Sequence, residues 1–207
     1  MLPIQKIIQL LKKEYPNSKC ALHFKSTFQL LVATILSAQC TDKRVNLVTV
    51  DLFKRYPTSK ILAKIKQGEL EKAIRSTGFY RNKAKNILAT ARKIEEKFAG
   101  KVPKTMEELL TLPGVARKTA NVILSVAYGK HEGITVDTHV RRLSQRLGLT
   151  TTQDPVKIEQ DLMQIIPKKN WGSISLLLID HGRAVCDAKK PRCHECCLAK
   201  LCPSNKN

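Results

Sequence analysis

Two basic side chains, Arg117 and Lys118, follow a Pro-Gly turn between two predicted helices. The turn at Pro113-Gly114 separates the end of the first helix, near Leu110, from the start of the second. The N–H groups at a helix start have no intrahelical partners, and together with the helix dipole they attract an anion. On DNA this anion would be a phosphate, contacted without regard to base sequence. The alternative is an ordinary corner between two helices.

An acidic residue, Asp137, lies about twenty residues further along, in the segment Thr135–His139 that opens another predicted helix. Asp137 is well placed to cap that helix. Backbone N–H groups that donate to its carboxylate would favour the ionised form. An ionised carboxylate is better suited to stabilising positive charge at a reacting carbon than to acting as a general acid. Helix capping and a catalytic role are therefore compatible expectations for this residue.

Cysteines form a third group that could do chemistry, because five of the seven lie in the last 22 residues. The four with the spacing C-x6-C-x2-C-x5-C are Cys186, Cys193, Cys196 and Cys202. By number, four thiolates suit either a tetrahedral zinc ion or a [4Fe–4S] cluster. Zinc sites usually have two closely spaced cysteine pairs, whereas this stretch has one, with His194 as a possible further zinc ligand. Cys20, Cys40 and Cys197 are expected to be plain thiols.

The composition is strongly basic, with 37 Lys and Arg against 17 Asp and Glu and a formal net charge of +20. A protein with this charge attracts polyanions. The basic residues are spread along the chain, which favours a broad basic face on a folded body over a charged tail. Nucleic acid is the first partner to consider and an anionic membrane surface the second. No apolar run approaches the roughly 20 residues that span a bilayer, and no signal peptide is recognised, so we expect a soluble intracellular protein.

Helical periodicity extends over almost the whole chain and must position these groups. Apolar residues recur at i, i+3, i+4 and i+7, as in the segment 4–11. Helix starts are marked by capping-box spacing after Ser26 and Thr105 and by Asp154 followed by proline. His181 lies on an apolar helical face and is expected to be a core residue. No clear strand alternation appears, so the predicted fold is all-α with about ten short helices.

Several motifs together resemble those of endonuclease III, a family of bifunctional DNA glycosylases in the helix-hairpin-helix superfamily. In chain order they are Leu36–Asp42, Gly78–Lys83, Leu112–Asn121, Val136–His139 and the cysteine cluster. The resemblance spans nearly the whole chain. It implies base excision repair, in which oxidised pyrimidines are removed from duplex DNA and the strand is cleaved at the abasic site by β-elimination. By matching position, Lys118 takes the place of the catalytic lysine and Asp137 that of the catalytic aspartate.

The resemblance also implies two helical lobes with DNA in the cleft between them. Residues 21–131 would form a six-helix domain with the helix-hairpin-helix motif, and residues 1–20 plus 132–207 a helical domain that carries a [4Fe–4S] cluster. The four cysteines named above would be the cluster ligands, because their spacing matches the family's iron–sulfur pattern. We expect a monomer in a prokaryotic cytoplasm, associated with the nucleoid and not with membranes, whose partner is duplex DNA containing damaged pyrimidines or abasic sites.

DNA contacts are expected from three parts of the chain. The hairpin contacts are Gly114, Ala116, Arg117 and Thr119. The contacts in a basic loop between the first two cysteines are Lys189, Lys190 and Arg192, unless this loop is simply a solvated charged segment. Gln39 and Phe79 match positions at which the family inserts side chains into DNA. As alternatives, Gln39 could cap the helix that ends near Ser37, and Phe79 could pack on a neighbouring helix.

The implied reaction needs a neutral amine at Lys118, which attacks the sugar C1′, releases the base and forms a Schiff base. A helix N-terminus contributes typically ~0.3–1 kcal/mol, too little to deprotonate a lysine, so burial against DNA is expected to supply most of the effect. A resting ion pair with Asp137 would favour the charged amine and is therefore not expected. The family usually has glycine at position 116, and Ala116 would be costly if that position required positive φ.

Two other functions compete with this interpretation. A monofunctional relative, such as an adenine-mismatch glycosylase, typically lacks the hairpin lysine and carries an extra C-terminal domain, and neither property fits this chain. A non-catalytic DNA-binding or cluster-bearing module is the second alternative. The presence of both Lys118 and Asp137 favours the catalytic interpretation over this module.

Overall fold

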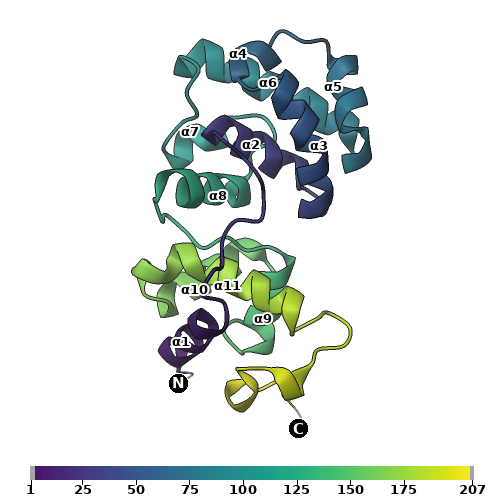
Figure 1. The fold of residues 1–207 in the computed structure, drawn as a ribbon. Coiled ribbons are helices and arrows are strands. Elements are labelled where there is room, and N and C mark those ends of the chain that lie inside the picture. Colours follow the sequence, from purple (N-terminus) through teal and green to yellow (C-terminus); the bar gives the residue numbers. More distant parts are fainter. Residues whose placement is uncertain (1–2, 206–207) are drawn as a thin grey trace. The chain divides into compact units, whose positions relative to one another are not determined.

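The computed structural model describes residues 3–205, and these contain eleven α-helices, four short 3-10 helices and no strand (Figure 1). The prediction of an all-α fold is therefore confirmed. The chain divides into a central unit, Ala21–Tyr128, and a terminal unit that combines Met1–Cys20 with Gly129–Asn207. The second boundary lies three residues before the expected one. Helix α8 ends at Tyr128, and Gly129 has a φ of +63°, a conformation in which helices commonly end.

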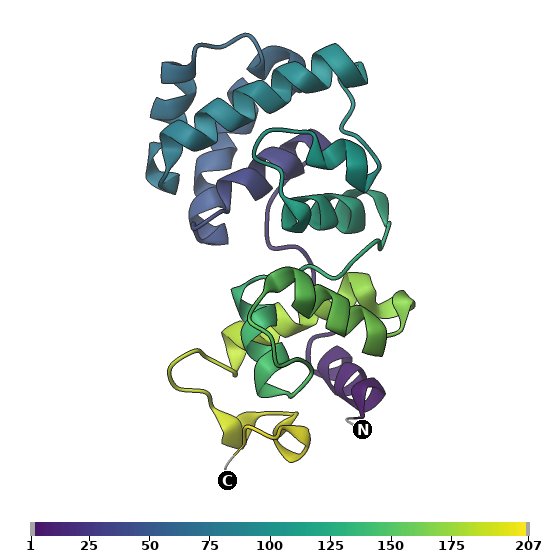
Figure 2. The ribbon, with the colours of Figure 1, turned by 180° about the vertical axis from the view of Figure 1, so that it is seen from behind.

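Helix α6 is the longest helix of the central unit, and both α4 and α5 pack against it (Figure 2). Helix α8 packs against α2 and α7. The expected six-helix domain contains seven α-helices, because Ser59–Leu62 forms a separate single turn. The helices are α2 (Thr27–Leu36), α3 (Asp42–Arg55), α4 (Ser59–Leu62), α5 (Gln67–Ile74), α6 (Tyr80–Phe98), α7 (Met106–Leu110) and α8 (Arg117–Tyr128), with the 3-10 helix η1 (Arg75–Thr77) before α6.

The sequence signals for helix starts correspond to real caps in this unit. Ser26 Oγ accepts a hydrogen bond from the Gln29 amide (3.2 Å), and Thr105 Oγ1 accepts one from the Glu108 amide (3.3 Å). These bonds satisfy N–H groups that a helix start leaves without a partner. Residues 28–36 of α2 are all buried, so this helix lies in the core of the central unit and fixes the segment that follows it.

The terminal unit joins segments from the two ends of the sequence, because α1 packs against α11 and α11 packs against α9. Its core is formed by apolar residues of these helices and of α10. No helix in the described part of the chain is both long and apolar enough to cross a membrane. The elements are α1 (Ile4–Glu14), α9 (Thr138–Arg146), α10 (Pro155–Ile165), η2 (Lys168–Asn170), α11 (Trp171–Ala184), η3 (Cys193–Glu195) and η4 (Ala199–Leu201).

Candidate active site and DNA interface

The turn that precedes α8 is held in place by side chains of α6. Thr90 Oγ1 donates a hydrogen bond to the Pro113 carbonyl (2.7 Å), and Lys93 Nζ donates one to the Thr111 carbonyl (2.7 Å). Each bond joins the long helix to the backbone of the turn. The position of the hairpin therefore depends on α6 and not only on the two helices that it connects.

Gly114 is required at the tip of this turn for two reasons. Its φ is +75°, and a Cβ at this position would lie 2.9 Å from the Cβ of Asn86 on α6. Other residues would therefore suffer both backbone strain and a clash. Ala116 is not among the described non-glycine residues with positive φ. The backbone strain expected for alanine at a position with positive φ is therefore absent at Ala116.

The first turn of α8 presents the predicted nucleophile at the surface. The Ala120 amide donates to the Ala116 carbonyl (3.0 Å), so the N–H groups of Arg117, Lys118 and Thr119 precede the helical hydrogen bonds. The Lys118 side chain is exposed, whereas Thr119 is only 8% exposed. A phosphate contact at Thr119 would therefore use its backbone N–H rather than its hydroxyl group.

Asp137 belongs to the terminal unit and caps α9. Its Oδ1 accepts hydrogen bonds from the amides of His139 and Val140, both at 2.8 Å, which confirms the predicted capping. Both bonds use the same oxygen, so the cap itself does not occupy Oδ2. Burial lowers the pKa of His139, in agreement with its Nδ1 lying 3.2 Å from the Arg142 guanidinium. His139 therefore contacts Arg142 within α9, and Asp137 is the carboxylate at the start of this helix.

Gln39 and Phe79 share an unusual backbone conformation. Their φ angles are +53° and +46°, in the left-handed region that non-glycine residues rarely adopt. Gln39 is exposed, and the Phe79 side chain is 64% exposed, so neither is placed as a buried packing residue. Strained conformations of this kind persist only where the surrounding structure enforces them, and they cluster at functional sites.

The four cysteines singled out by their spacing line a single cavity in the terminal unit. Its volume is about 90 Å³. A cavity needs roughly 10–15 Å³ to hold one water, so this cavity is larger than a single water requires. In the described residues no three His, Cys, Asp or Glu side chains converge closely enough to share one metal ion. The cavity is lined by Cys186, Cys193, Cys196 and Cys202 together with residues that include Arg146 and Arg192.

Polar groups around this cavity are directed at the cysteine sulfurs. Arg146 Nη1 lies 3.2 Å from Cys186 Sγ, and the Leu198 amide lies 3.4 Å from Cys196 Sγ. Hydrogen bonds to sulfur are a common feature around thiolate ligands and tune the group they bind. Two of the four sulfurs, those of Cys186 and Cys196, therefore have an N–H group beside them.

The Cys196 thiol lies close to the other three cysteines of the cavity. Burial raises the pKa of the Cys196 thiol, and the neighbouring thiols of Cys186, Cys193 and Cys202 raise it further. Burial and the neighbouring sulfurs therefore favour the protonated thiol at Cys196.

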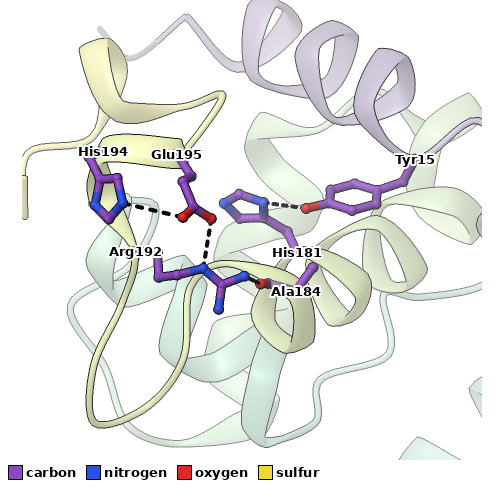
Figure 3. Close-up of polar contacts among 6 residues, drawn as sticks. All are labelled: Tyr15, His181, Ala184, Arg192, His194 and Glu195. Carbon is purple, nitrogen blue, oxygen red and sulfur yellow. Dashed lines mark hydrogen bonds and ion pairs between the residues drawn. The ribbon is translucent and has the colours of Figure 1, made fainter.

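The loop between Cys186 and Cys193 is partly fixed by internal contacts. Figure 3 shows Arg192 between Glu195, whose Oε2 lies 2.7 Å from its Nε, and the Ala184 carbonyl, to which its Nη2 donates. His194 Nε2 lies 3.2 Å from Glu195 Oε1, and His194 does not line the cavity, so the possible zinc ligand points elsewhere. Because the Arg192 guanidinium already contacts Glu195 and the Ala184 carbonyl, the expected contact with a phosphate would have to form beside these two.

Lys189 and Lys190 lie at the exposed part of this loop. Their backbone amides donate to Asp187 Oδ1 at 2.8 and 3.2 Å. The turn is thereby closed by bonds from backbone amides to the Asp187 carboxylate, and both lysine side chains are exposed. Arg146 of α9 also donates to the Asp187 carbonyl (2.6 Å) and the Ala188 carbonyl (2.8 Å), so the loop has contacts within itself and with α9.

His181 connects the cysteine region to α1. It is 2% exposed, as expected of a core histidine, and its Nδ1 lies 2.9 Å from Tyr15 Oη (Figure 3). Its Nε2 lies 3.3 Å from Cys196 Sγ. Burial lowers the pKa of His181, which favours the neutral ring. The contact with Cys196 was missed from the sequence, because α11 and the cysteine turns are joined by a loop whose path has no periodic signal.

Two arginines of α9 were also missed. Arg146 contacts Cys186 Sγ, and the Arg142 side chain donates to the Cys186 carbonyl at 3.0 Å. The signal that could have found them is their spacing, since residues four apart lie on the same face of a helix. The helix capped by Asp137 therefore also supports the cysteine cavity.

Comparison with known proteins gives this arrangement a family context. Residues 32–168 match the model of the HhH-GPD superfamily base excision DNA repair protein. Endonuclease III of Synechocystis sp. is 62% identical over 198 residues, which cover 96% of this chain and 90% of that protein. Endonuclease III of Bacillus subtilis is 47% identical, and the match covers 91% of this chain and 86% of that protein.

Solved structures show the same likeness in three dimensions. A non-covalent complex of endonuclease III with DNA has a TM-score of 0.93 and 44% identity, and the match covers 100% of this chain and 98% of that one. A trapped covalent intermediate of endonuclease III with DNA has a TM-score of 0.93 and 45% identity, with the same coverage.

Proposed function

Because the chain belongs to the endonuclease III family of the HhH-GPD superfamily of base excision DNA repair proteins, we propose that it removes oxidised pyrimidines from duplex DNA and cleaves the abasic strand through Lys118. Base excision repair by a DNA glycosylase with lyase activity follows from the family membership. The lesion class and the residue roles are the proposal. The observation that carries it is the exposed amine of Lys118 on the first turn of α8, directly behind a turn held by α6.

The reaction begins when the neutral Lys118 amine forms a bond to the sugar C1′ and the bond from C1′ to the base breaks. Ring opening and loss of a proton from nitrogen leave the protonated Schiff base. This imine acidifies C2′, and removal of a C2′ proton expels the 3′ phosphate in β-elimination. Water then cleaves the imine and restores the amine. An amine is required because a carboxylate or hydroxyl could not form the imine.

Asp137 is the group proposed to stabilise positive charge that develops at the sugar and to accept the proton that Lys118 releases. Its Oδ1 is oriented by the N-terminus of α9, and Oδ2 is not used by the cap. A carboxylate oriented in this way requires no reorganisation when charge develops. The preceding hairpin would hold a backbone phosphate through Gly114, Ala116, Arg117 and Thr119 and thus position the sugar.

Gln39 and Phe79 are proposed to fill the space that the extruded base leaves. Chemistry on a base within a duplex requires the base to leave the stack. The exposed Phe79 ring and the Gln39 amide occupy strained backbone positions that point to such a role. The alternatives from the sequence are disfavoured, because Ser37 and not Gln39 is the C-cap of α2 and because the Phe79 side chain is exposed.

Cys186, Cys193, Cys196 and Cys202 are proposed to hold a [4Fe–4S] cluster. The support is the shared cavity, the N–H groups directed at sulfur and the position of His194 outside it. When bound, the cluster would link η3 and η4 to the end of α11 and so order the basic loop, without a role in base removal. Bacterial relatives favour a prokaryotic cytoplasm, with DNA binding placing the protein at the nucleoid.

Metal analysis distinguishes the two groups that the sequence left open. After anaerobic purification we expect about four iron atoms per chain and no stoichiometric zinc, because the thiols surround a space larger than one ion. Iron and zinc are measured by elemental analysis alongside the visible absorption of the cluster. About one zinc per chain and no iron would overturn the assignment.

The basic loop should contribute to DNA affinity without base preference. Replacing Lys189 or Lys190 with alanine should weaken binding to every duplex alike and reduce the slope of log affinity against log salt by ~0.9 for each phosphate that is no longer neutralised. Binding is measured by fluorescence anisotropy over a salt series. Lys200, which is exposed on η4, provides a matched control for the removal of one charge. A slope that matches that of the unaltered protein would return the loop to an ordinary charged surface.

Defined lesions test the proposed substrate class. Duplexes that carry one oxidised pyrimidine, one oxidised purine, one alkylated purine or no lesion are incubated with the protein, and free base and strand nicking are quantified separately. We expect base release and nicking with the oxidised pyrimidine. Efficient nicking of abasic DNA without release of any pyrimidine base would contradict the assigned lesion class while leaving the lyase activity intact.

A further inference from the structure

Lys83, on the first turn of α6, is a buried charged side chain that the reaction does not use. It is 5% exposed, and its Nζ donates hydrogen bonds to the Leu36 carbonyl (2.8 Å) and the Thr77 carbonyl (2.7 Å). Burial lowers the pKa of Lys83, and the nearby Cys40 thiol opposes this effect. Burying an amine is unfavourable unless hydrogen bonds compensate, and these two bonds supply that compensation. The question is what the buried amine contributes at this place.

Both acceptors are the last residues of helical elements. Leu36 ends α2 and Thr77 ends η1, where carbonyl groups have no partner within the helix and the helix dipole attracts a cation. The two elements are far apart in the sequence. The Lys83 ammonium therefore joins the C-terminal ends of α2 and η1, which no hydrogen bond within a single helix could join.

Two of the three described non-glycine residues with positive φ follow these two ends, and the third is Ala99 at the end of α6. Gln39 lies three positions after Leu36, and Phe79 lies two positions after Thr77. Their φ angles are +53° and +46°, and both side chains are exposed. A left-handed conformation costs a non-glycine residue free energy that the surrounding structure must supply. The segments that carry Gln39 and Phe79 thus both begin at a carbonyl held by the same amine.

We propose that Lys83 is a positioning residue that fixes the Gln39 and Phe79 segments relative to each other, so that both side chains enter the DNA together. This inference rests on the proposed insertion role of Gln39 and Phe79. An apolar side chain of similar length would fill the same space but would release both carbonyls. Removal of the amine should therefore affect the insertion of the two side chains more than the packing of the core.

Base unstacking gives a direct readout. The full chain is bound at saturating concentration to a duplex with a stable abasic-site analogue opposite 2-aminopurine, whose fluorescence rises when it leaves the stack. Lys83→Met should reduce this rise and slow base release by about tenfold or more, because the strained segments can relax. Lys85→Met, which removes an exposed charge from the same helix, should leave both unchanged.

Combining variants separates positioning from general damage. If Lys83 acts through Gln39 and Phe79, adding Lys83→Met to a protein that already carries Gln39→Ala and Phe79→Ala should cause no further loss. Multiplying losses would overturn the proposal. If Phe79→Ala and Gln39→Ala both unstack the base fully, the proposed insertion role fails instead. Lys83→Gln, which keeps a neutral hydrogen-bond donor, is measured in parallel. If both Lys83 variants are unfolded at the assay temperature, Lys83 is needed for the fold itself. That result would contradict the positioning role.

Discussion

Replacing Lys118 with glutamine should abolish strand nicking at abasic sites while leaving the fold and DNA affinity nearly unchanged. The side chain is exposed on the first turn of α8, and glutamine is a good helix former, so little structural cost is expected. The amine that forms the Schiff base is absent from this variant. Removal of a covalent nucleophile typically costs several orders of magnitude, so we expect single-turnover nicking to fall at least ~10³-fold.

The control must separate loss of the nucleophile from loss of one positive charge. Lys101→Gln removes an exposed lysine from the same unit. It should weaken DNA binding slightly and leave the nicking rate at saturation unaltered. Nicking by Lys118→Gln at more than a tenth of the unaltered rate would mean that another group attacks the sugar. The affinity of Lys118→Gln for a duplex with an abasic site, measured at fixed salt, shows whether this variant still binds DNA.

Replacing Asp137 with asparagine should lower base release by roughly 10²–10⁴-fold, the range for loss of a group that transfers protons in the transition state. Asparagine caps a helix about as well as aspartate, so the bonds from the His139 and Val140 amides can be kept. The variant should therefore unfold at nearly the same temperature as the unaltered protein. Base release under single-turnover conditions is measured together with thermal unfolding.

Asp137→Ala is the matched comparison, because it removes both the cap and the carboxylate. Loss of a cap lowers the free energy of unfolding by about 0.5–2 kcal/mol, so Asp137→Ala should be less stable than Asp137→Asn. Its base release should be at least as low as that of Asp137→Asn. If Asp137→Asn retained full activity and only Asp137→Ala were impaired, Asp137 would be a helix cap and nothing more.

Local features of the chain were predictable from the sequence. The capping residues Ser26, Thr105 and Asp137 accept the expected amide bonds, because a cap depends on residues only two or three positions apart. The turn at Gly114 was predictable for the same reason. The cysteines that share a cavity were identifiable by spacing, since a ligand set within 17 residues is also local.

Contacts between distant elements were not predictable. The bonds from Thr90 and Lys93 to the hairpin, and from Lys83 to the ends of α2 and η1, join residues 6 to 47 positions apart. No periodic pattern specifies such partners. The left-handed backbone of Phe79 likewise arises from its surroundings and not from the preference of phenylalanine. The contacts of Arg192 with Glu195 and with the Ala184 carbonyl were likewise not predictable from the sequence.

Covalent trapping tests the central claim most directly. The unaltered protein is incubated with duplex DNA that contains one abasic site in the presence of borohydride, which reduces a Schiff base to a stable amine link. The adduct is then digested and the modified peptide is identified by mass spectrometry. We predict a single adduct on Lys118 and none in Lys118→Gln. An adduct on another lysine, or on the N-terminal amine, in the unaltered protein would contradict the assignment of Lys118 as the nucleophile.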